Sequence, residues 1–252
     1  MKISIVVQYF NRRTLLLNTL RSIQQSKVKN DVEVIIIDDA SGNDHRITDV
    51  QNMFPDLQIV LFEFKSEEKW WCCPVIPINK GISLATGDII MFLCAECMFI
   101  GDVLADLQKR IKPNDYIVYG TWAIEQEDTE KIANMNYNDI VSNRFKGKWY
   151  HHSLYHNTCY NFCSAILRED LNELGGFDER YAHGVAHGDD DFLLRVRRKG
   201  MNIISVEDVY VYHQWHPSMA VYPNTGQIAD AQLYHHVLHN EPNNYKVKNS
   251  FI

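Results

Sequence analysis

The chain has 252 residues, 46% of them hydrophobic and 23% charged, and its formal net charge at pH 7 is −7. This length and composition suffice for a full α/β core. Because no low-complexity run or linker divides the chain, we expect one globular domain over residues 1–252. The negative charge disfavours binding to nucleic acid. The longest apolar stretch, residues 89–100, is interrupted by Glu96 and is shorter than the roughly 20 residues of a bilayer-spanning helix, which argues against an integral membrane protein.

The amino-terminal segment predicts a strand followed by a helix. Residues 2–7 form a short β-branched apolar run, which is typical of a buried strand and begins too early to leave room for a signal peptide. In residues 13–26, leucine and isoleucine recur at helical spacing, with Asn11 and Thr14 as candidate caps.

A second apolar run, residues 32–37, predicts a buried strand that ends in Asp38 and Asp39. Polar groups at the carboxyl ends of parallel strands are where open α/β sheets bind ligands. Both carboxylates therefore belong to a candidate site. A purely structural role, in which the acid caps the following turn, stays open, and it fits Asp38 better than Asp39.

Residues 78–93 predict a helix start with Asn79 and Lys80, followed by a Gly-Asp turn and a central strand. Directly after this strand the chain reads Cys-Ala-Glu-Cys over residues 94–97. Within that turn, only Glu96 offers a hard oxygen ligand at neutral pH.

The cysteines give a weaker indication of metal binding. Cys94 and Cys97 form the only pair with a zinc-like interval, so structural zinc is disfavoured. Because no secretory signal precedes the first strand, we expect free thiols in a reducing compartment and a cytoplasmic location. The six cysteines are Cys72, Cys73, Cys94, Cys97, Cys159 and Cys163.

Residues 125–156 show no clear periodicity and become aromatic and basic toward their end. A long irregular segment beside the site of an α/β enzyme is often a lid or an acceptor loop. Aromatic rings offer flat apolar faces to a ligand, so Trp149 and Tyr150 are candidate acceptor contacts, and so are Trp70 and Trp71. Ordinary packing in the core or on the surface remains an alternative for all four.

Residues 175–191 contain a Gly-Gly-Phe-Asp-Glu turn and then three consecutive carboxylates, Asp189, Asp190 and Asp191. Like charges this close raise the pKa of at least one member, which indicates a chemical use, although acids also favour the first turn of a helix. Asp191 lies four residues before Arg195, which suits an ion pair. The basic residues 195–199 fit a solvated helix face, and peripheral contact with anionic lipid is left open.

These segments resemble, in the same order, the motifs of family 2 of the inverting glycosyltransferases. Residues 4–11, Ser-Ile-Val-Val-Gln-Tyr-Phe-Asn, stand for Ser-Ile-Val-Ile-Pro-Thr-Tyr-Asn, and residues 38–41 stand for Asp-Asp-Gly-Ser. Residues 78–93 resemble the Arg-Asn-x-Gly helix, the Gly-Asp turn and the central strand. Residues 175–191 resemble the family's acceptor-site region, and also the Glu-Asp-Asp-Asp region of galactosyltransferases.

The resemblance implies the GT-A fold of nucleotide-diphospho-sugar transferases, a Rossmann-like α/β fold with a mostly parallel central sheet flanked by helices. Residues 1–123 would form the nucleotide-sugar-binding half and residues 124–223 the acceptor and catalytic half. Residues 224–252 would form a carboxyl-terminal helix and tail.

The resemblance also assigns roles to single residues. Asp189 would be the catalytic base, with Gly188 standing where the family carries a Glu, and Asp190 would orient the acceptor together with Trp149 and Tyr150. Asp39 would hydrogen-bond the base of the nucleotide. The residues expected to contact the nucleotide sugar are Gln8, Tyr9, Phe10, Asn11, Asp39, Asn79, Lys80 and Glu96.

The chain departs from the family at the metal motif. Members carry Asp-x-Asp where this chain has Cys94, Ala95 and Glu96, so metal binding is weakened in expectation. Glu96 and His213 would form the metal site, with His216 the less favoured ligand. Because imidazole is a borderline ligand, this set suits Mn²⁺ better than Mg²⁺.

The expected activity is inverting transfer of a sugar from a nucleotide-diphosphate sugar, most simply a UDP-sugar, to a hydroxyl of a glycan or other acceptor. One alternative is a catalytically degenerate GT-A domain that binds a nucleotide sugar or a protein partner. A sugar nucleotidyltransferase is disfavoured because residues 8–11 contain no glycine for a phosphate loop.

Overall fold

The computed structural model describes residues 1–184, 186–217 and 225–249. The strands in these ranges are β1 (Ile3–Tyr9), β2 (Val32–Asp38), β3 (Gln58–Glu63), β4 (Ile89–Cys94), β5 (Cys97–Ile100), β6 (Asp115–Ile124), β7 (Gly147–His151), β8 (Cys163–Leu167) and β9 (Asn202–His213). The α-helices are α1 (Arg13–Gln24), α2 (Val50–Met53), α3 (Val75–Leu84), α4 (Val103–Arg110), α5 (Gln126–Ile132), α6 (Tyr137–Ser142), α7 (Arg168–Leu174), α8 (Gly188–Arg198) and α9 (Thr225–Asn240).

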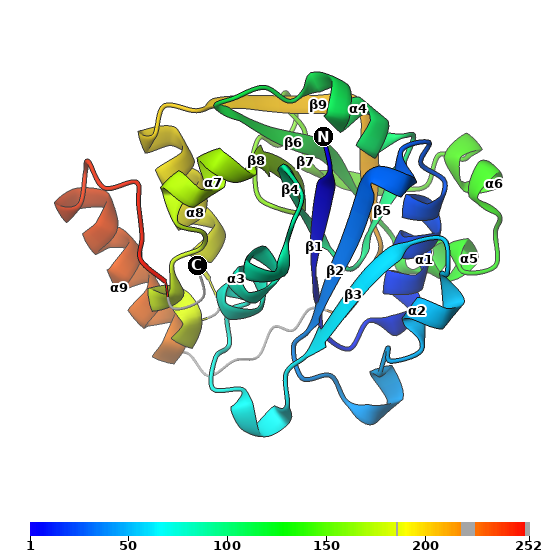
Figure 1. The fold of residues 1–252 in the computed structure, drawn as a ribbon, viewed down its shortest axis with the longest axis horizontal. Coiled ribbons are helices and arrows are strands. Elements are labelled where there is room, and N and C mark those ends of the chain that lie inside the picture. The colour runs from blue at the N-terminus through cyan, green and yellow to red at the C-terminus, as the bar shows by residue number, and fades with distance from the viewer. Residues whose placement is uncertain (185, 218–224, 250–252) are drawn as a thin grey trace.

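The strands form one sheet between two layers of helices. Their order is β3-β2-β1-β4-β8-β6-β9-β5, and β7 pairs with β6 at the edge. In Figure 1, α3, α7, α8 and α9 lie on one side of the sheet and α1 and α2 on the other. No helix among the described residues has both the length and the apolar character needed to cross a bilayer.

The sheet is mixed. Strands β3, β2, β1 and β4 run parallel, as the amino-terminal motifs predict. The second half then introduces antiparallel pairs, because β8 runs against both β4 and β6, and β5 runs against β9. The mostly parallel arrangement therefore describes the amino-terminal half of the sheet better than the carboxyl-terminal half.

Each face of the sheet has its own core because side chains alternate along a strand. Ile5 of β1 packs in one cluster with Leu16 and Leu20 of α1. Val6, the next residue, packs in the other cluster with Ile82 of α3. Alternate residues of β1 and the apolar face of α1 therefore pack together on one side of the sheet.

The strand register brings the predicted site residues to one edge. Tyr9 is paired with Asp38, and Gln8 with Cys94, so the ends of β1, β2 and β4 lie side by side. At the other end of the strand order, the pairing of β5 with β9 places His213 opposite Cys97, the residue after Glu96.

Two local expectations are corrected. Helix α1 begins after Arg12, and neither Asn11 nor Thr14 provides its cap. Residues 125–156 are not an irregular lid, because they contain α5, α6 and β7. The predicted tail helix is present as α9.

Candidate functional site

The two-residue connection between β4 and β5 holds Glu96 in a fixed position. Gln214 donates to the carbonyl of Glu96 from its backbone N–H at 3.1 Å and from Nε2 at 3.0 Å. Thr19 Oγ1 donates to the carbonyl of Ala95 at 2.8 Å. Glu96 is 3% exposed, so its carboxylate is a buried charge at the edge of the sheet.

Three side chains surround the Glu96 carboxylate. Oε1 lies 3.3 Å from His213 Nε2, 3.5 Å from His216 Nε2 and 2.8 Å from Arg12 Nη1. Burial would raise the pKa of Glu96, but the hydrogen bonds from both histidines and the charge of Arg12 outweigh burial and hold this pKa well below its usual range.

The donor atoms of Glu96, His213 and His216 lie within 4.8 Å of one another, a spacing that could hold a metal ion. Oε2 of Glu96 is buried and has no hydrogen-bond partner among the described residues, so it remains available as a ligand atom. The sequence favoured His213 over His216, whereas the structure brings both histidines to the carboxylate.

The acidic triplet opens α8, and its three members have different surroundings. Asp191 is buried and pairs with Arg195 Nε at 2.7 Å, which confirms the predicted ion pair. Asp190 accepts a hydrogen bond from Tyr160 Oη at 2.6 Å and lies 2.8 Å from His187 Nδ1. These bonds fix the direction of the Asp190 side chain.

Asp189 is exposed at the start of α8. Burial and, secondarily, the charge of Asp190 raise the pKa of Asp189 to about 7. With its amide turned to satisfy both of its polar groups, Asn161 donates to Asp189 Oδ1 at 2.6 Å. A carboxyl group with this pKa exchanges protons near neutral pH, as a general base requires.

Gly188 has a steric reason for replacing the family's Glu. A Cβ atom at this position would lie 3.0 Å from Val75 Cγ1 and 3.2 Å from Cys73 Sγ, which is tighter than most contacts of real Cβ atoms. The segment before α3 therefore packs against the start of α8, and leaves little room for a side chain at this position.

The loops after β1 and β2 are joined to each other. Asn11 has a φ of 53° and accepts from the backbone N–H of Gly42 at 2.8 Å. The backbone N–H of Asn11 donates to Ser41 Oγ at 2.9 Å. Asp38 accepts from Ser41 N–H at 2.9 Å, so it caps this turn as the structural alternative predicted.

Asp39 and Phe10 lie beside the same lysine. Asp39 accepts from Lys69 Nζ at 2.8 Å and from Trp71 Nε1 at 2.8 Å. Lys69 Nζ also lies 4.2 Å from the centre of the Phe10 ring. Burial raises the pKa of Asp39 against the effect of these bonds. Trp71 is thus a buried hydrogen-bond donor to Asp39.

Four other predicted contacts have structural partners. Tyr9 is 1% exposed and points into the core, and Gln8 Nε2 lies 3.8 Å from Cys94 Sγ. Asn79 is fully buried and exchanges hydrogen bonds with the backbone of Phe177. Lys80 Nζ lies 4.5 Å from the centre of the Phe62 ring. The structure does not bring Asn79 or Tyr9 to the open part of the site.

Tyr150 lies near residues of two acidic centres, namely the Glu96 carboxylate with its histidines and the acidic triplet that opens α8. Its ring centre lies 4.9 Å from that of His213 and 5.7 Å from that of Phe162. Phe162 follows Tyr160 and Asn161, the partners of Asp190 and Asp189. Trp149, on the opposite side of β7, contacts Trp122 instead. Trp70 is 56% exposed, beside His183.

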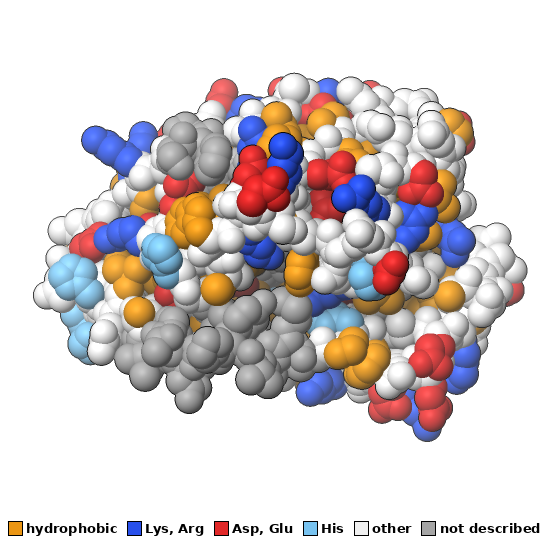
Figure 2. All heavy atoms as spheres, turned by 90° about the horizontal axis from the view of Figure 1, so that it is seen from below, with side chains coloured by type: hydrophobic (Ala, Val, Ile, Leu, Met, Phe, Trp, Pro, Cys, Tyr) orange, Lys and Arg blue, Asp and Glu red, His pale blue; other side chains and the backbone are white. Residues whose placement is uncertain are grey.

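The face at the carboxyl ends of β1 and β2 carries acidic, basic and histidine side chains close together, as Figure 2 shows. A pocket of about 410 Å³ lies beside Arg12, Arg13 and His216 and also contacts Asn11 and Trp215. The candidate site therefore combines an open space, basic groups and a metal-ligand set.

Known proteins allow the family to be assigned. The model of glycosyltransferase-like family 2 matches residues 3–230, which is most of the chain. This chain belongs to glycosyltransferase-like family 2. The prediction of a family 2 glycosyltransferase is confirmed at the level of the family.

Two curated relatives of this family 2 chain are glycosyltransferases by name. One is the GalNAc(5)-diNAcBac-PP-undecaprenol beta-1,3-glucosyltransferase of Campylobacter jejuni, 27% identical over 159 residues that cover 59% of this chain and 50% of that protein. The other is the amylovoran biosynthesis glycosyltransferase AmsB of Erwinia amylovora, 27% identical over 217 residues that cover 81% of this chain and 66% of that protein. The chain thus spans about half to two-thirds of their lengths.

Solved structures confirm the predicted GT-A fold of the family 2 chain. Staphylococcus aureus TarS 1–349 in complex with UDP-GlcNAc has a TM-score of 0.67 at 15% identity, over 95% of this chain and 67% of that one. The mannosyltransferase PcManGT from Pyrobaculum calidifontis, in complex with GDP-Man and Mn²⁺, has a TM-score of 0.61 at 20% identity, over 96% and 65%.

Sequence reasoning on this family 2 chain missed three partners of the predicted residues. Arg12 contacts Glu96, Asn161 contacts Asp189, and Tyr160 contacts Asp190. Arg12 directly follows the first motif, so its position carried a signal. Tyr160 and Asn161 lie just after residues 125–156 and outside every motif recognised in the sequence.

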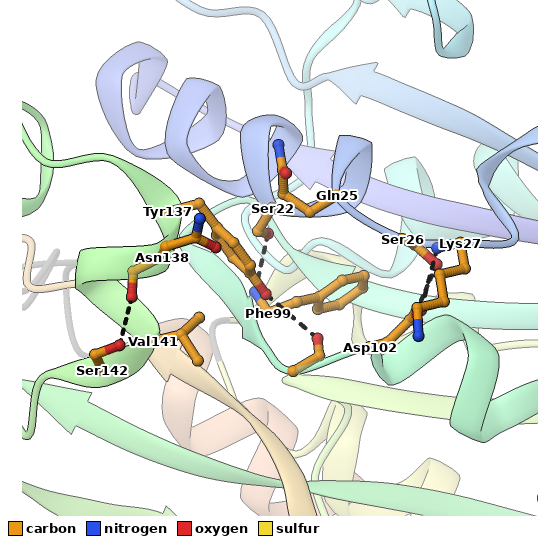
Figure 3. A pocket seen from close by; sticks show the side chains of 11 residues that line it. Ser22, Gln25, Ser26, Lys27, Phe99, Asp102, Tyr137, Asn138, Val141 and Ser142 are labelled. Atoms are coloured by element: carbon orange, nitrogen blue, oxygen red, sulfur yellow. Dashed lines mark hydrogen bonds between the residues drawn. The ribbon is translucent and has the colours of Figure 1, made fainter.

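A second pocket of about 400 Å³ lies away from these residues, between α1, α6 and the end of β5 (Figure 3). Its polar groups bond to one another, since Ser26 Oγ donates to Asp102 at 2.6 Å and Tyr137 Oη donates to the carbonyl of Gly101 at 3.4 Å. These bonds support the packing of α1 and α6, and we assign no chemistry to this pocket.

The six cysteines of the family 2 chain are free thiols in the structure. Cys97 and Cys163 are buried, and burial raises the pKa of both thiols well above the usual value. A buried neutral thiol of this kind is unreactive.

Proposed function

We propose that this family 2 protein is an inverting glycosyltransferase that moves a sugar from a nucleotide-diphosphate sugar to an acceptor hydroxyl of a glycan. Two observations carry the proposal. One is Asp189, an exposed carboxyl that is hydrogen-bonded to Asn161 and has a pKa raised to about 7. The other is the buried metal-ligand set of Glu96, His213 and His216. That combination supplies a base for the acceptor and charge compensation for the leaving group.

The donor lies at the carboxyl ends of β1 and β2 in this proposal. Its base is recognised near Phe10, Asn11 and Asp39, and its diphosphate lies near Arg12 and Glu96. The two similar structures are complexes with UDP-GlcNAc and with GDP-Man, which supports a nucleotide-sugar donor. A UDP-sugar is the simplest choice.

A divalent metal fits the residues present. Glu96, His213 and His216 would hold it, since their donor atoms lie within 4.8 Å of one another and Oε2 of Glu96 lacks a partner among the described residues. Imidazole and carboxylate together suit Mn²⁺ better than Mg²⁺, and a similar structure was determined with Mn²⁺. When bound, such an ion neutralises charge on the leaving diphosphate.

Asp189 performs the proton transfer. It accepts the proton of the acceptor hydroxyl as that oxygen forms a bond to the anomeric carbon of the donor sugar. The bond between the anomeric carbon and the diphosphate oxygen breaks on the opposite face, and the nucleoside diphosphate leaves with the electron pair. Attack opposite the leaving group inverts the anomeric configuration.

The acceptor sugar lies between Asp190 and Tyr150. Asp190 is held by Tyr160 and His187, so its free lone pairs can accept hydrogen bonds from acceptor hydroxyls in a fixed direction. Tyr150 offers a ring beside His213, and Trp149 continues the aromatic surface outward.

One observation favours a second candidate, a domain that binds nucleotide sugar without catalysis. Arg12 already pairs with Glu96 at 2.8 Å, and a guanidinium there balances the carboxylate without a metal. In that case the donor would bind independently of metal and would not be turned over.

Calorimetry with UDP and UDP-sugars, with and without Mn²⁺, tests the proposal. We expect Mn²⁺ to tighten binding in the native chain, and Glu96→Ala to remove at least about tenfold of that gain. Glu67→Ala, an exposed acid on the same chain, is the matched control. Absence of nucleotide-sugar binding would refute the donor site.

Turnover separates the two candidates. The native chain should hydrolyse or transfer the bound UDP-sugar, and Asp189→Asn should bind it equally well but reduce turnover by about 10²-fold or more. Binding without turnover in the native chain would favour the non-catalytic domain.

A further inference from the structure

An aromatic pocket lies at the edge of the sheet, outside the acidic centres. It has a volume of about 540 Å³, within the range of ligand pockets. We call it the outer aromatic pocket. Its lining residues are Trp122, Lys148, Trp149, Tyr150, Tyr155 and His156.

The rings of this pocket are held in place by their neighbours. Trp149 meets Trp122 edge-on with ring centres 4.9 Å apart, and His152 on its other side at 4.6 Å. Gly120 lies under Trp149, since a Cβ atom there would come within 3.3 Å of the Trp149 ring. The indole therefore has a fixed orientation.

Tyr155 is the most exposed ring of the pocket, at 74%. The turn that carries it is nevertheless well fixed, because His152 and His156 exchange backbone hydrogen bonds at 3.0 and 3.1 Å. The backbone N–H of Ser153 also donates to Glu207 Oε1 at 2.9 Å. An exposed ring on a tied turn is preorganised, which lowers the entropy that binding costs.

The pocket is continuous with the reaction centre through Tyr150. Asp189 is hydrogen-bonded to Asn161. Phe162, which follows Asn161 in the chain, has its ring centre 5.7 Å from that of Tyr150. Tyr150 itself lines the outer aromatic pocket. A ligand that begins at Asp189 can therefore extend over Tyr150 toward Trp149 and Tyr155.

We propose that the outer aromatic pocket is a second acceptor subsite, which binds a sugar unit of the acceptor beyond the unit whose hydroxyl reacts. The acceptor is accordingly an oligosaccharide or a longer glycan and not a monosaccharide. This inference rests on the proposed glycosyltransferase function and adds the length of the acceptor to it.

The chemistry of the lining favours sugar over a purely apolar ligand. A pyranose has C–H groups on its faces and hydroxyls around its rim, and the pocket offers ring faces together with the polar tips of Lys148, His156 and the tyrosines. Leu154, the most apolar group of the turn, is 83% exposed and is not part of the lining.

Ligand-observed saturation-transfer NMR on the full chain tests the subsite without needing turnover. The probes are glucose, galactose, mannose and N-acetylglucosamine, and the neutral tetrasaccharides built from each of them in α and β linkage. We expect at least one tetrasaccharide to bind more tightly than its monosaccharide. Tyr155→Ser should weaken that tetrasaccharide about three- to tenfold and leave the monosaccharide unchanged, while Tyr155→Phe should retain binding.

Leu154→Ser is the matched control, because it changes an equally exposed apolar residue on the same turn outside the pocket. It should leave tetrasaccharide binding unchanged. If no tetrasaccharide binds, or if Tyr155→Ser and Leu154→Ser have the same effect on its binding, the subsite is refuted. If both variants instead weaken binding to phosphatidylglycerol vesicles while tetrasaccharide binding is unaffected, the turn contacts lipid and the proposal is also refuted.

Nucleotide binding distinguishes failure of the subsite from failure of the proposed glycosyltransferase function. Tyr155 is not one of the residues assigned to the donor, so Tyr155→Ser should bind UDP as the native chain does. Normal UDP binding and turnover without a tetrasaccharide effect would overturn the subsite alone, whereas failure of the native chain to bind any UDP-sugar would overturn the proposed function itself.

Discussion

Asp189 and Asp190 are adjacent in the chain, but their surroundings give them different chemistry. Asp190 is fixed by Tyr160 and His187, whereas Asp189 has one donor, Asn161, and a pKa raised to about 7. Burial is the larger cause of this shift and the charge of Asp190 the smaller, so Asp190 raises the pKa of Asp189 without contacting it through a hydrogen bond.

The raised pKa of Asp189 predicts an acidic limb in the pH profile. A base must be deprotonated, so hydrolysis of a bound UDP-sugar should rise with pH through about 7, and kcat/KM should fall about tenfold per pH unit well below that value. The measurement is a pH profile of donor hydrolysis. Asp190→Asn removes the like charge and should move the limb to lower pH, while a limb near pH 4 in the native chain would contradict the assignment.

The sequence identified the charged members of the site but not their partners. Glu96 became a candidate because it follows a recognisable strand, His213 because of the family resemblance, and Asp189 because three acids in succession need an explanation. Arg12 pairs with Glu96 across 84 positions, a relation set by the β1–β4 register and not by local pattern. Asn79 shows the converse, since its motif position is recognisable but its amide is used by Phe177.

Helix α8 carries a buried ion pair behind its acidic face. Asp191 and Arg195 are 0% and 1% exposed, and Arg195 Nη1 also donates to the carbonyl of Leu174 at 3.1 Å, which ties α8 to α7. Burial raises the pKa of Asp191, and Arg195 opposes this. The pair thereby anchors the helix turn that presents Asp189 to the open side.

Loss of Arg195, the partner of Asp191, should strongly reduce the stability of the fold. Arg195→Met leaves Asp191 as an uncompensated buried carboxylate, so we expect the free energy of unfolding to fall by about 3–5 kcal/mol. Urea denaturation provides the measurement. Arg197→Met changes an exposed arginine of the same helix and should alter stability by less than about 0.5 kcal/mol. Equal effects of the two variants would show that the buried pair does not anchor α8.

Element prediction succeeded where a long local pattern exists. Helix α1 has an apolar period that matches its buried face, and strands β1, β2 and β4 are continuous apolar runs that are buried along most of their length. It failed over residues 125–156, where α5, α6 and β7 have only 7, 6 and 5 residues. Elements this short show too few periods for detection and depend on tertiary contacts, such as the β6–β7 pairing.

At the scale of the whole molecule, the amino ends of the parallel strands meet at Glu33. This residue of β2 is 2% exposed and accepts from Lys2 Nζ at 2.6 Å, Ser4 Oγ at 2.5 Å and the backbone N–H of Thr86 at 2.6 Å. Since Thr86 precedes β4, one carboxylate joins β1, β2 and the connection to β4. It lies at the opposite edge of the sheet from the candidate site.

This carboxylate should make stability depend on pH in the acidic range. Burial alone would raise the pKa of Glu33, but the bonds from Lys2, Ser4 and Thr86 lower it to about 2. A folded-state pKa below the unfolded value of 4.5 stabilises the fold above pH 4.5, and the stabilisation is lost as pH falls toward 2. The contribution at pH 7 is on the order of 3 kcal/mol.

The Glu33→Gln variant should therefore be less stable than the native chain by roughly this amount at pH 7. Urea unfolding at a series of pH values should show this difference in stability narrowing between pH 4.5 and 2. Glu67→Gln, at an exposed position, should follow the native chain throughout. A gap for Glu33→Gln that stays constant with pH would show that the charge of Glu33 does not hold the amino edge together.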